Sequence, residues 1–250
     1  MTDISELIQE LQTAIKDNVI EKKIGIAFSG GVDSTLLAKL CSDLNYDVTL
    51  LTIGFENSHD ILFSKKINDI MKLPHQIHEI EKNSFDEISS KIKSKIKTDN
   101  LSWNENCIAF YYVSQLAKKH NLTTVVTANG IDELFCGYNA YRDVISQGAK
   151  AVQELMDTKL ENETKMMKAV NSITSEFDVT LIQPFLSERF INHAKKIPIG
   201  EKIQNSEDLI RKHIIRHAAK DVGVSEISAN QRKKALQYGS KIHKALIKSR

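Results

Sequence analysis

Cysteine, proline and tryptophan are scarce in this chain of 250 residues, which has three, three and one of them respectively. The cysteines Cys41, Cys107 and Cys136 are odd in number, far apart and form no Cys-x-x-Cys pair. This pattern disfavours a disulfide framework and a structural zinc site. Free thiols indicate a reducing compartment.

Long apolar runs are also lacking. No stretch approaches the roughly 18 apolar residues of a membrane-spanning helix. Residues 1–18 are amphipathic instead of uniformly apolar, so they do not resemble a signal peptide. We therefore expect a cytoplasmic protein with no membrane partner.

Neither sign of charge is in large excess: 34 Lys and Arg residues face 32 Asp and Glu residues, a net charge of +2. So small an excess argues neither for nor against a nucleic-acid partner, but no RNA-binding appendage is evident either, so we expect none. The basic stretch 91–97 is interpreted as a solvated helix face, whereas Arg232-Lys233-Lys234 is considered again below. Apolar residues make up 41% of the chain, enough for a sizeable core.

Apolar patterning predicts alternating strands and helices up to about Tyr141. Strand-like runs lie at 23–28, 48–53, 75–80 and 123–127, and helical stripes at 4–15, 36–44, 61–71, 84–96 and 108–117. Continuously hydrophobic strands between helices predict a doubly wound α/β fold with a mainly parallel sheet. The remainder is mostly helical, with a candidate strand at 179–182. No linker is evident, so we predict a single domain with an N-terminal helix (1–20), an α/β core (21–141) and a helical part (142–250).

Ser29-Gly30-Gly31-Val32-Asp33-Ser34 connects the first predicted strand to a helix. The glycines let backbone amides approach an anion, and the helix N-terminus adds partial positive charge. A carboxylate beside phosphate implies an intervening cation, so Asp33 is a candidate Mg²⁺ ligand. The loop fits neither Gly-x-x-x-x-Gly-Lys nor Gly-x-Gly-x-x-Gly, which weakens a kinase, GTPase or dinucleotide interpretation. The alternative is an ordinary capped turn.

A second polar cluster, residues 127–138, follows the fourth predicted strand. Open parallel sheets bind ligands at the carboxyl ends of their strands. If the first and fourth strands are neighbours, Asp132 can approach Asp33 and complete a Mg²⁺ site with phosphate oxygens. The alternative is an acidic N-cap on a helix.

The loop 29–34 resembles the signature of the ATP pyrophosphatases, which cleave ATP between its α and β phosphates. Residues 130–138 are similar to the Gly-x-Asp-Glu-Leu-Phe-Gly-Gly-Tyr signature of asparagine synthetases and the related β-lactam synthetases. Matches at 54–60, 183–186 and 197–198 extend the resemblance over residues 24–246. It implies a Rossmann-like fold of the adenine nucleotide alpha hydrolase type, with ATP and Mg²⁺ as cofactors.

The resemblance also implies a role for each matching residue. Those expected to hold pyrophosphate are Ser29, Gly30, Gly31, Asp33 and Ser34. Asp33 and Asp132 are expected to bind Mg²⁺. The adenosine side is expected to be lined by Ala27, Ile53, Thr127 (where serine is usual) and Ala128. An Arg-x-Lys segment of the family matches residues 232–234, so Lys234 is expected to join the two aspartates in catalysis, with Lys233 as a substitute.

The implied reaction forms an acyl-adenylate from a small-molecule carboxylate and releases pyrophosphate; a nitrogen nucleophile then displaces AMP. Three positions depart from the pattern. Thr2 stands where glutamine-dependent relatives have a nucleophilic cysteine, so we expect no glutaminase domain, with nitrogen from ammonia, an amine or a separate glutaminase subunit. Asn129 replaces a glutamate, which puts aspartate in doubt as the acyl substrate, and Cys136 replaces a glycine. The alternatives are another ATP pyrophosphatase, such as a tRNA-modifying enzyme, or a non-catalytic nucleotide-binding subunit.

Overall fold

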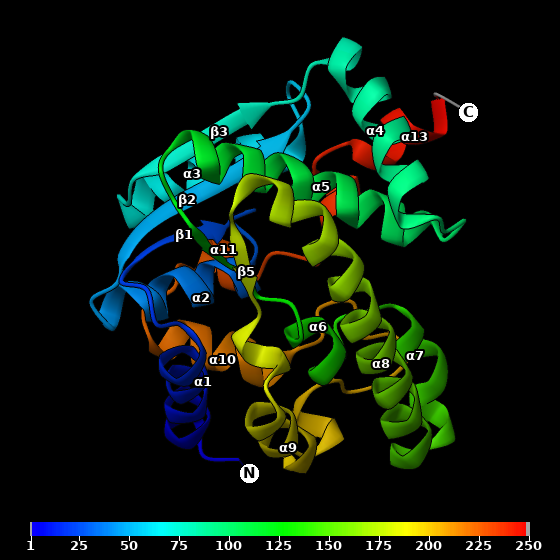
Figure 1. The fold of residues 1–250 in the computed structure, drawn as a ribbon. Coiled ribbons are helices and arrows are strands. Elements are labelled where there is room, and N and C mark those ends of the chain that lie inside the picture. Colours follow the sequence, from blue (N-terminus) through cyan, green and yellow to red (C-terminus); the bar gives the residue numbers. More distant parts are fainter. Residues whose placement is uncertain (1, 249–250) are drawn as a thin grey trace.

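A five-stranded parallel sheet lies at the centre of the fold in the computed structural model, which describes residues 2–248 (Figure 1). Its strands are β1 (Lys23–Ala27), β2 (Asp47–Gly54), β3 (His75–Glu79), β4 (Thr124–Val126) and β5 (Thr180–Ile182). They lie in the order β3-β2-β1-β4-β5, and all neighbouring pairs are parallel. The four predicted strands are confirmed to within a residue or so at each end. The candidate strand at 179–182 is also present, so the sheet extends beyond the predicted α/β core.

The strand order places β1 beside β4, with Gly25 opposite Val125 and Ile26 opposite Val126. From β1 the chain proceeds to β2 and β3 on one side, and β4 leads to β5 on the other. Such a reversal opens a crevice at the carboxyl ends of the strands, where doubly wound folds bind ligands. The two polar loops of the sequence therefore emerge side by side.

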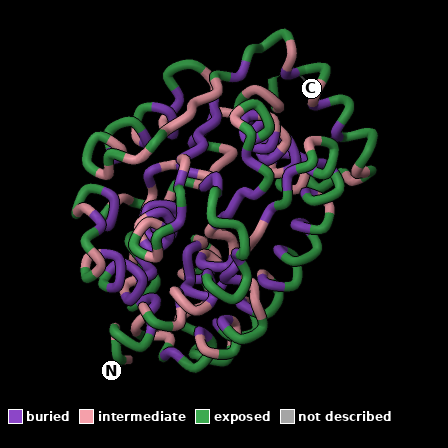
Figure 2. Tube along the Cα trace, turned by 60° about the vertical axis from the view of Figure 1, so that its left-hand side comes forward, coloured by how far each residue is buried: buried purple, intermediate pink, exposed green. Residues whose placement is uncertain are grey.

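Helices cover both faces of the sheet because its side chains alternate between them. Leu50 packs with α1 (Ile4–Asn18), α2 (Val32–Asp43) and α3 (His59–Met71). The next residue, Leu51, packs with α4 (Lys82–Ile96) and α5 (Leu101–Lys119). The buried segments of Figure 2 lie along the strands and the inner sides of these helices. The doubly wound α/β fold is thus confirmed.

The C-terminal part is mostly helical, as predicted. The helices that follow β4 are α6 (Ile131–Leu134), α7 (Ala140–Val144), α8 (Ala149–Thr174), α9 (Glu188–Lys196), α10 (His213–Asp221), α11 (Glu226–Ala229), α12 (Leu236–Gly239) and α13 (Ile242–Lys248). Helix α8 contributes to both cores, with Met156 in one and Met166 in the other. In the part of the chain described, no helix is both long and apolar enough to cross a membrane.

Helix α5 begins seven residues before its predicted apolar stripe. Asn100 caps it by accepting a hydrogen bond from the Trp103 amide at 3.2 Å. The first turn is partly exposed and has no apolar stripe. Its start therefore depends on the cap, which periodicity does not detect.

Candidate functional site

A cavity of about 270 Å³ opens at the carboxyl ends of β1, β2 and β4. It is bounded by the loop 29–34, the loop 127–138, α5, α8 and the segment 231–237. The predicted site residues that line it are Ala27, Ser29, Gly31, Asp33, Ser34, Ile53, Thr127, Ala128, Asp132 and Lys234. Gly30 does not line the cavity; a side chain there would meet Phe63, with Cδ1 at 3.0 Å.

The loop 29–34 is a tight turn into α2. Gly30 has a φ of +79°, in the left-handed region that glycine adopts readily. Ser34 Oγ donates to the Gly31 carbonyl at 3.2 Å and lies 3.4 Å from Ser29 Oγ. No side chain caps α2 at Gly31. The first amides of the helix are therefore available to an anion.

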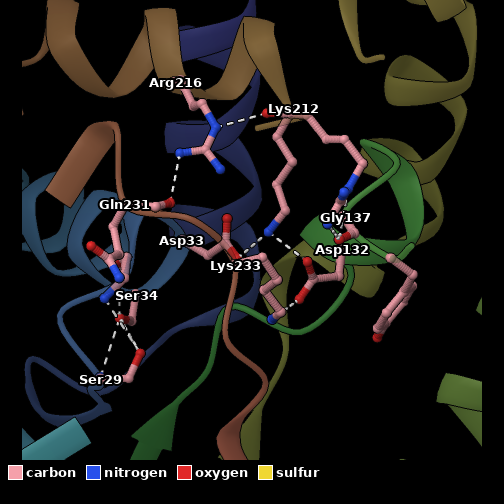
Figure 3. Close-up of polar contacts among 12 residues, drawn as sticks. Ser29, Asp33, Ser34, Asp132, Gly137, Lys212, Arg216, Gln231 and Lys233 are labelled. Atoms are coloured by element: carbon pink, nitrogen blue, oxygen red, sulfur yellow. Dashed lines mark hydrogen bonds and ion pairs between the residues drawn. The ribbon is translucent and has the colours of Figure 1, made fainter. Parts of the chain in front are cut away.

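Asp33 and Asp132 point toward a shared ammonium group (Figure 3). Lys212 Nζ lies 2.5 Å from Asp33 Oδ2 and 2.5 Å from Asp132 Oδ1, and its side chain is only 1% exposed. Lys233 forms an ion pair with the other oxygen of Asp132. Two carboxylates and two ammonium groups thus form one cluster in which the formal charges cancel.

Of the two neighbouring lysines Lys233 and Lys234, it is Lys233 that contacts Asp132, whereas Lys234 was the one predicted to act with the aspartates. Residues 231–235 form neither helix nor strand, and neighbouring side chains in such a segment point in different directions. Here it is Lys233 that faces Asp132. Lys234 lines the cavity elsewhere, and its charge partly offsets the rise that burial causes in the pKa of Asp60.

Asp132 and Lys233 remain ionised despite their burial. Burial alone would raise the pKa of the Asp132 carboxyl, but the charges of Lys212 and Lys233 outweigh this effect and lower that pKa below its ordinary value. For Lys233 the two effects have the opposite signs. Burial lowers its pKa, but the charges of Asp132 and Asp33 raise that pKa by more, so the net shift is upward. Asp132 and Lys233 are thus charged at neutral pH.

The two aspartates suit a divalent cation. Asp33 Oδ1 is buried and accepts no hydrogen bond from residues 2–248, so an acceptor oxygen is free. The same residues contain no group of three or more acidic, histidine or cysteine side chains that could hold a metal ion. Mg²⁺ is usually held by one or two carboxylates together with substrate phosphates, so a pair of aspartates fits this ion.

The loop that carries Asp132 is fixed from within. Glu133 Oε2 accepts from the Gly130 amide at 3.1 Å, and Oε1 accepts from the Tyr138 hydroxyl. A side chain at Gly137 would overlap Asp132 Oδ1 and would lie 2.5 Å from Lys212 Cε. The close packing of the two charged groups therefore requires glycine at this position.

Cys136 has a φ of +60° and is fully buried. Glycine adopts this left-handed conformation without steric cost, which accounts for the glycine usual at the position. Burial raises the pKa of the Cys136 thiol to about 12, so the thiol is protonated and unreactive at neutral pH.

Asn129 connects the loop to a carboxylate on α8. Thr127 Oγ1 donates to Asn129 Oδ1 at 2.6 Å, which turns the amide nitrogen toward Glu163. Asn129 Nδ2 donates to Glu163 Oε1, also at 2.6 Å. Glu163 is 5% exposed, and burial, followed by the charge of Glu133, raises its pKa to about 8. A carboxylate therefore lies beside position 129, although residue 129 is itself neutral.

Three site residues were missed in the sequence: Glu163, Lys212 and Arg216 line the cavity from the C-terminal half. Glu163 is one of many acidic residues on a long helix, and the two basic residues are in a segment with no strong local motif. The Lys-x-x-x-Arg spacing across the start of α10 is their only local pattern. Such a pattern is common, so spacing alone does not single it out.

Comparisons with known proteins agree with this geometry. The family model described as asparagine synthase matches residues 6–175. A Methanocaldococcus jannaschii protein named provisionally as a glutamine-hydrolysing asparagine synthetase is 28% identical over 281 residues, covering 97% of this chain and 51% of its own length. A Bacillus subtilis glutamine-hydrolysing asparagine synthetase is 28% identical over 157 residues, covering 58% of this chain and 24% of its own length.

A more distant match is a tRNA-specific 2-thiouridylase of Fusobacterium nucleatum. It is 28% identical over 155 residues, covering 56% of this chain and 45% of its own length. The chain thus spans about half the length, or less, of these relatives.

Proposed function

Because the chain belongs to the asparagine synthase family, we propose that it is an ATP-dependent ligase that converts a substrate carboxylate to an amide. The carboxylate attacks the α-phosphorus of ATP, pyrophosphate leaves, and a nitrogen nucleophile displaces AMP from the acyl-adenylate. One observation carries the proposal: Asp33 and Asp132, from loops after neighbouring strands, converge with two lysines beside the loop 29–34.

The polyphosphate would lie over the loop 29–34, held by backbone amides and by the hydroxyls of Ser29 and Ser34. The nucleoside would lie along the strand ends, where Ala27, Ile53 and Ala128 line the cavity. Asp33 and Asp132 would hold Mg²⁺, which when bound neutralises phosphate charge. The ion pairs already balance the protein charges, so a triphosphate brings uncompensated negative charge that the metal would offset.

The lysines would stabilise charge that develops at the α-phosphate and on the departing pyrophosphate. Lys212 and Lys233 are placed for this because Lys212 contacts both aspartates and Lys233 contacts Asp132. Lys234, favoured by the resemblance in sequence, remains a second candidate because it lines the same cavity.

Glu163 would accept the proton of the attacking nitrogen. Its carboxyl group lines the cavity, and a pKa of about 8 lets the fraction ionised near and above neutral pH act as a base. Asn129 would orient it by the 2.6 Å hydrogen bond. The nucleophile would be ammonia or an amine, free or delivered by a separate glutaminase subunit.

The direct test is pyrophosphate release from ATP and Mg²⁺ in the presence of a panel of carboxylates and amines. We expect Asp33→Asn and Asp132→Asn each to reduce release to background while the protein stays folded by circular dichroism. Asp43→Asn, at an exposed site on the same helix as Asp33, is the matched control and should retain activity. Wild-type rates in both site variants would show that the metal ligands are assigned wrongly.

A further inference from the structure

Arg216 joins two backbone segments and has no role in the steps proposed above. It lies on α10 and is 3% exposed. Its Nε donates to the Arg211 carbonyl and its Nη2 to the Ile210 carbonyl, both at 2.7 Å. Its Nη1 donates to the Ala229 carbonyl at 2.5 Å and to the Gln231 carbonyl at 3.0 Å.

These two segments carry the lysines of the charged cluster. Residues 210–211 directly precede Lys212, and Gln231 lies two residues before Lys233. Figure 3 shows Arg216 beyond Lys212 from Asp132, with Gln231 at one end of its guanidinium. One planar group therefore fixes the backbone from which both ammonium groups reach the aspartates.

The backbone before α10 needs such support. Arg211 has a φ of +50° and Lys212 a φ of +54°, a left-handed pair without glycine. Residues in this region persist only where their surroundings hold them. Arg216 supplies two of these contacts, and the Arg211 guanidinium supplies another by donating to the Gly137 carbonyl at 3.1 Å.

The bonding of Arg216 is unusual for a buried cation. Within residues 2–248 its guanidinium donates hydrogen bonds to neutral backbone carbonyl groups, and it forms no ion pair with a carboxylate. A guanidinium presents five N–H groups in one rigid plane, whereas a lysine ammonium has three donors at a single point. The planar group is therefore needed to span two segments.

We propose that Arg216 is a positioning residue that sets Lys212 and Lys233 at the two aspartates, so that the lysines act as one unit. The role of those two lysines at phosphate is taken from the proposed function, so this inference rests on it. The competing arrangement is direct contact of Arg216 with pyrophosphate, because its side chain also borders the cavity. The two arrangements differ in whether the losses of pyrophosphate binding caused by substituting Arg216 and Lys212 are additive.

Amide hydrogen exchange tests the structural step without any ligand. In Arg216→Lys we expect residues 208–212 and 229–233 to exchange together, at least about tenfold faster than in the wild type, as loss of a hydrogen bond to a charged group implies. Lys202→Met is the matched control, because Lys202 is buried, donates to the Ala194 carbonyl and does not line the cavity. It should leave both segments unchanged. Wild-type protection of either segment in Arg216→Lys would overturn the proposal.

Calorimetric titration with inorganic pyrophosphate tests the link to the lysines. We expect Arg216→Lys and Lys212→Met each to weaken binding about tenfold or more, and the double variant to bind little worse than either one. Arg216→Gln, which keeps a planar donor group, serves as a second variant if lysine disturbs folding. Additive losses would indicate direct contact with pyrophosphate and overturn the positioning role.

A wild-type protein that neither binds pyrophosphate nor activates any carboxylate would refute the proposed function instead. Amide exchange would then still decide whether Arg216 holds the two segments. The failures of the two proposals are therefore distinguishable.

Discussion

At the scale of single residues, Glu163 couples the site to pH. Its pKa of about 8 in the folded protein lies above the ordinary value of a glutamate, first because of burial and then because of the charge of Glu133. Between these two pKa values the folded protein holds a proton that the unfolded chain releases. The contribution of this proton to the free energy of unfolding is complete at low pH. It declines as the pH rises from the ordinary glutamate pKa toward 8, and it is lost above about pH 8.

We expect Glu163→Gln to remove this decline. Relative to the wild type, the variant should gain stability between pH 5 and pH 8, by up to about 4 kcal/mol, since the window covers about three pH units at about 1.4 kcal/mol each. Urea unfolding across this range measures the difference. Glu161→Gln, exposed on the same helix, should follow the wild-type pH profile. A constant difference between Glu163→Gln and the wild type would contradict the raised pKa.

Glu163→Gln should also separate the two half-reactions. Carboxylate-dependent exchange between ATP and pyrophosphate should persist, while amide formation falls by about 10²–10⁴-fold, the usual contribution of a general base. Comparing exchange with product formation in one preparation measures this. Equal losses in both steps would assign Glu163 to the first half-reaction instead.

The neighbouring lysines provide a second comparison at the residue scale. Lys233→Met should lower pyrophosphate exchange by about 10²–10³-fold, because it removes a charge held beside Asp132. Lys234→Met removes the adjacent charge, which does not contact the aspartates, and should have a smaller effect. Initial rates of exchange under the same conditions measure both. The reverse ranking would restore Lys234 as the lysine that acts on phosphate.

At the scale of elements, the loop after β4 combines rigidity with close packing. Glu133 fixes its backbone, while Gly137 leaves room for Asp132 and Lys212. Two charged side chains can therefore meet there only because one position has no Cβ.

Gly137→Ala should displace the Asp132 carboxylate and lower pyrophosphate exchange at least about tenfold, because small displacements of positioned groups have large kinetic effects. Gly200→Ala is the control, since a Cβ there meets nothing within 4 Å and its φ is not in the left-handed region. Steady-state rates and thermal unfolding of both variants measure the outcome. Full activity in Gly137→Ala would show that the carboxylate position matters little.

At the scale of the whole molecule, the site depends on segments from both halves of the chain. The Ser228 hydroxyl donates to the Gly30 carbonyl at 2.7 Å, which joins α11 to the loop 29–34. The Phe55 amide donates to the Ser240 carbonyl at 3.0 Å, and His243 pairs with Glu105 at 2.5 Å. The segment with Lys233 is thus anchored at both of its ends.

Ile242, fully buried in the core shared with α5, tests that arrangement. Ile242→Ala should destabilise the fold by about 2–5 kcal/mol, as buried Ile-to-Ala changes do. It should also lower exchange activity, although residue 242 does not line the cavity. Ile247→Ala, at a half-exposed position on the same helix, is the control for both measurements. Unchanged activity in folded Ile242→Ala would mean that the anchor does not position Lys233.

The sequence by itself determined the fold class, the strands and the two loops that form the cavity. The continuously hydrophobic runs of strand length and the Gly-Gly turn before α2 are local features, so they can be found without distant contacts. The motifs that carry Asp33 and Asp132 are local in the same sense. Their convergence needed only that β1 and β4 be neighbours, which the sheet order confirmed.

Only the tertiary structure decided which cations and which further carboxylate complete the site. Lys212, Arg216 and Glu163 are separated from the loop 29–34 by more than a hundred residues. Their place depends on packing of α8 against α5 and β5, on packing of α10 against α1 and α2, and on a left-handed pair before α10. The choice between Lys233 and Lys234 depends on the direction of one irregular segment. Such features arise from contacts between distant parts of the chain, which no local pattern encodes.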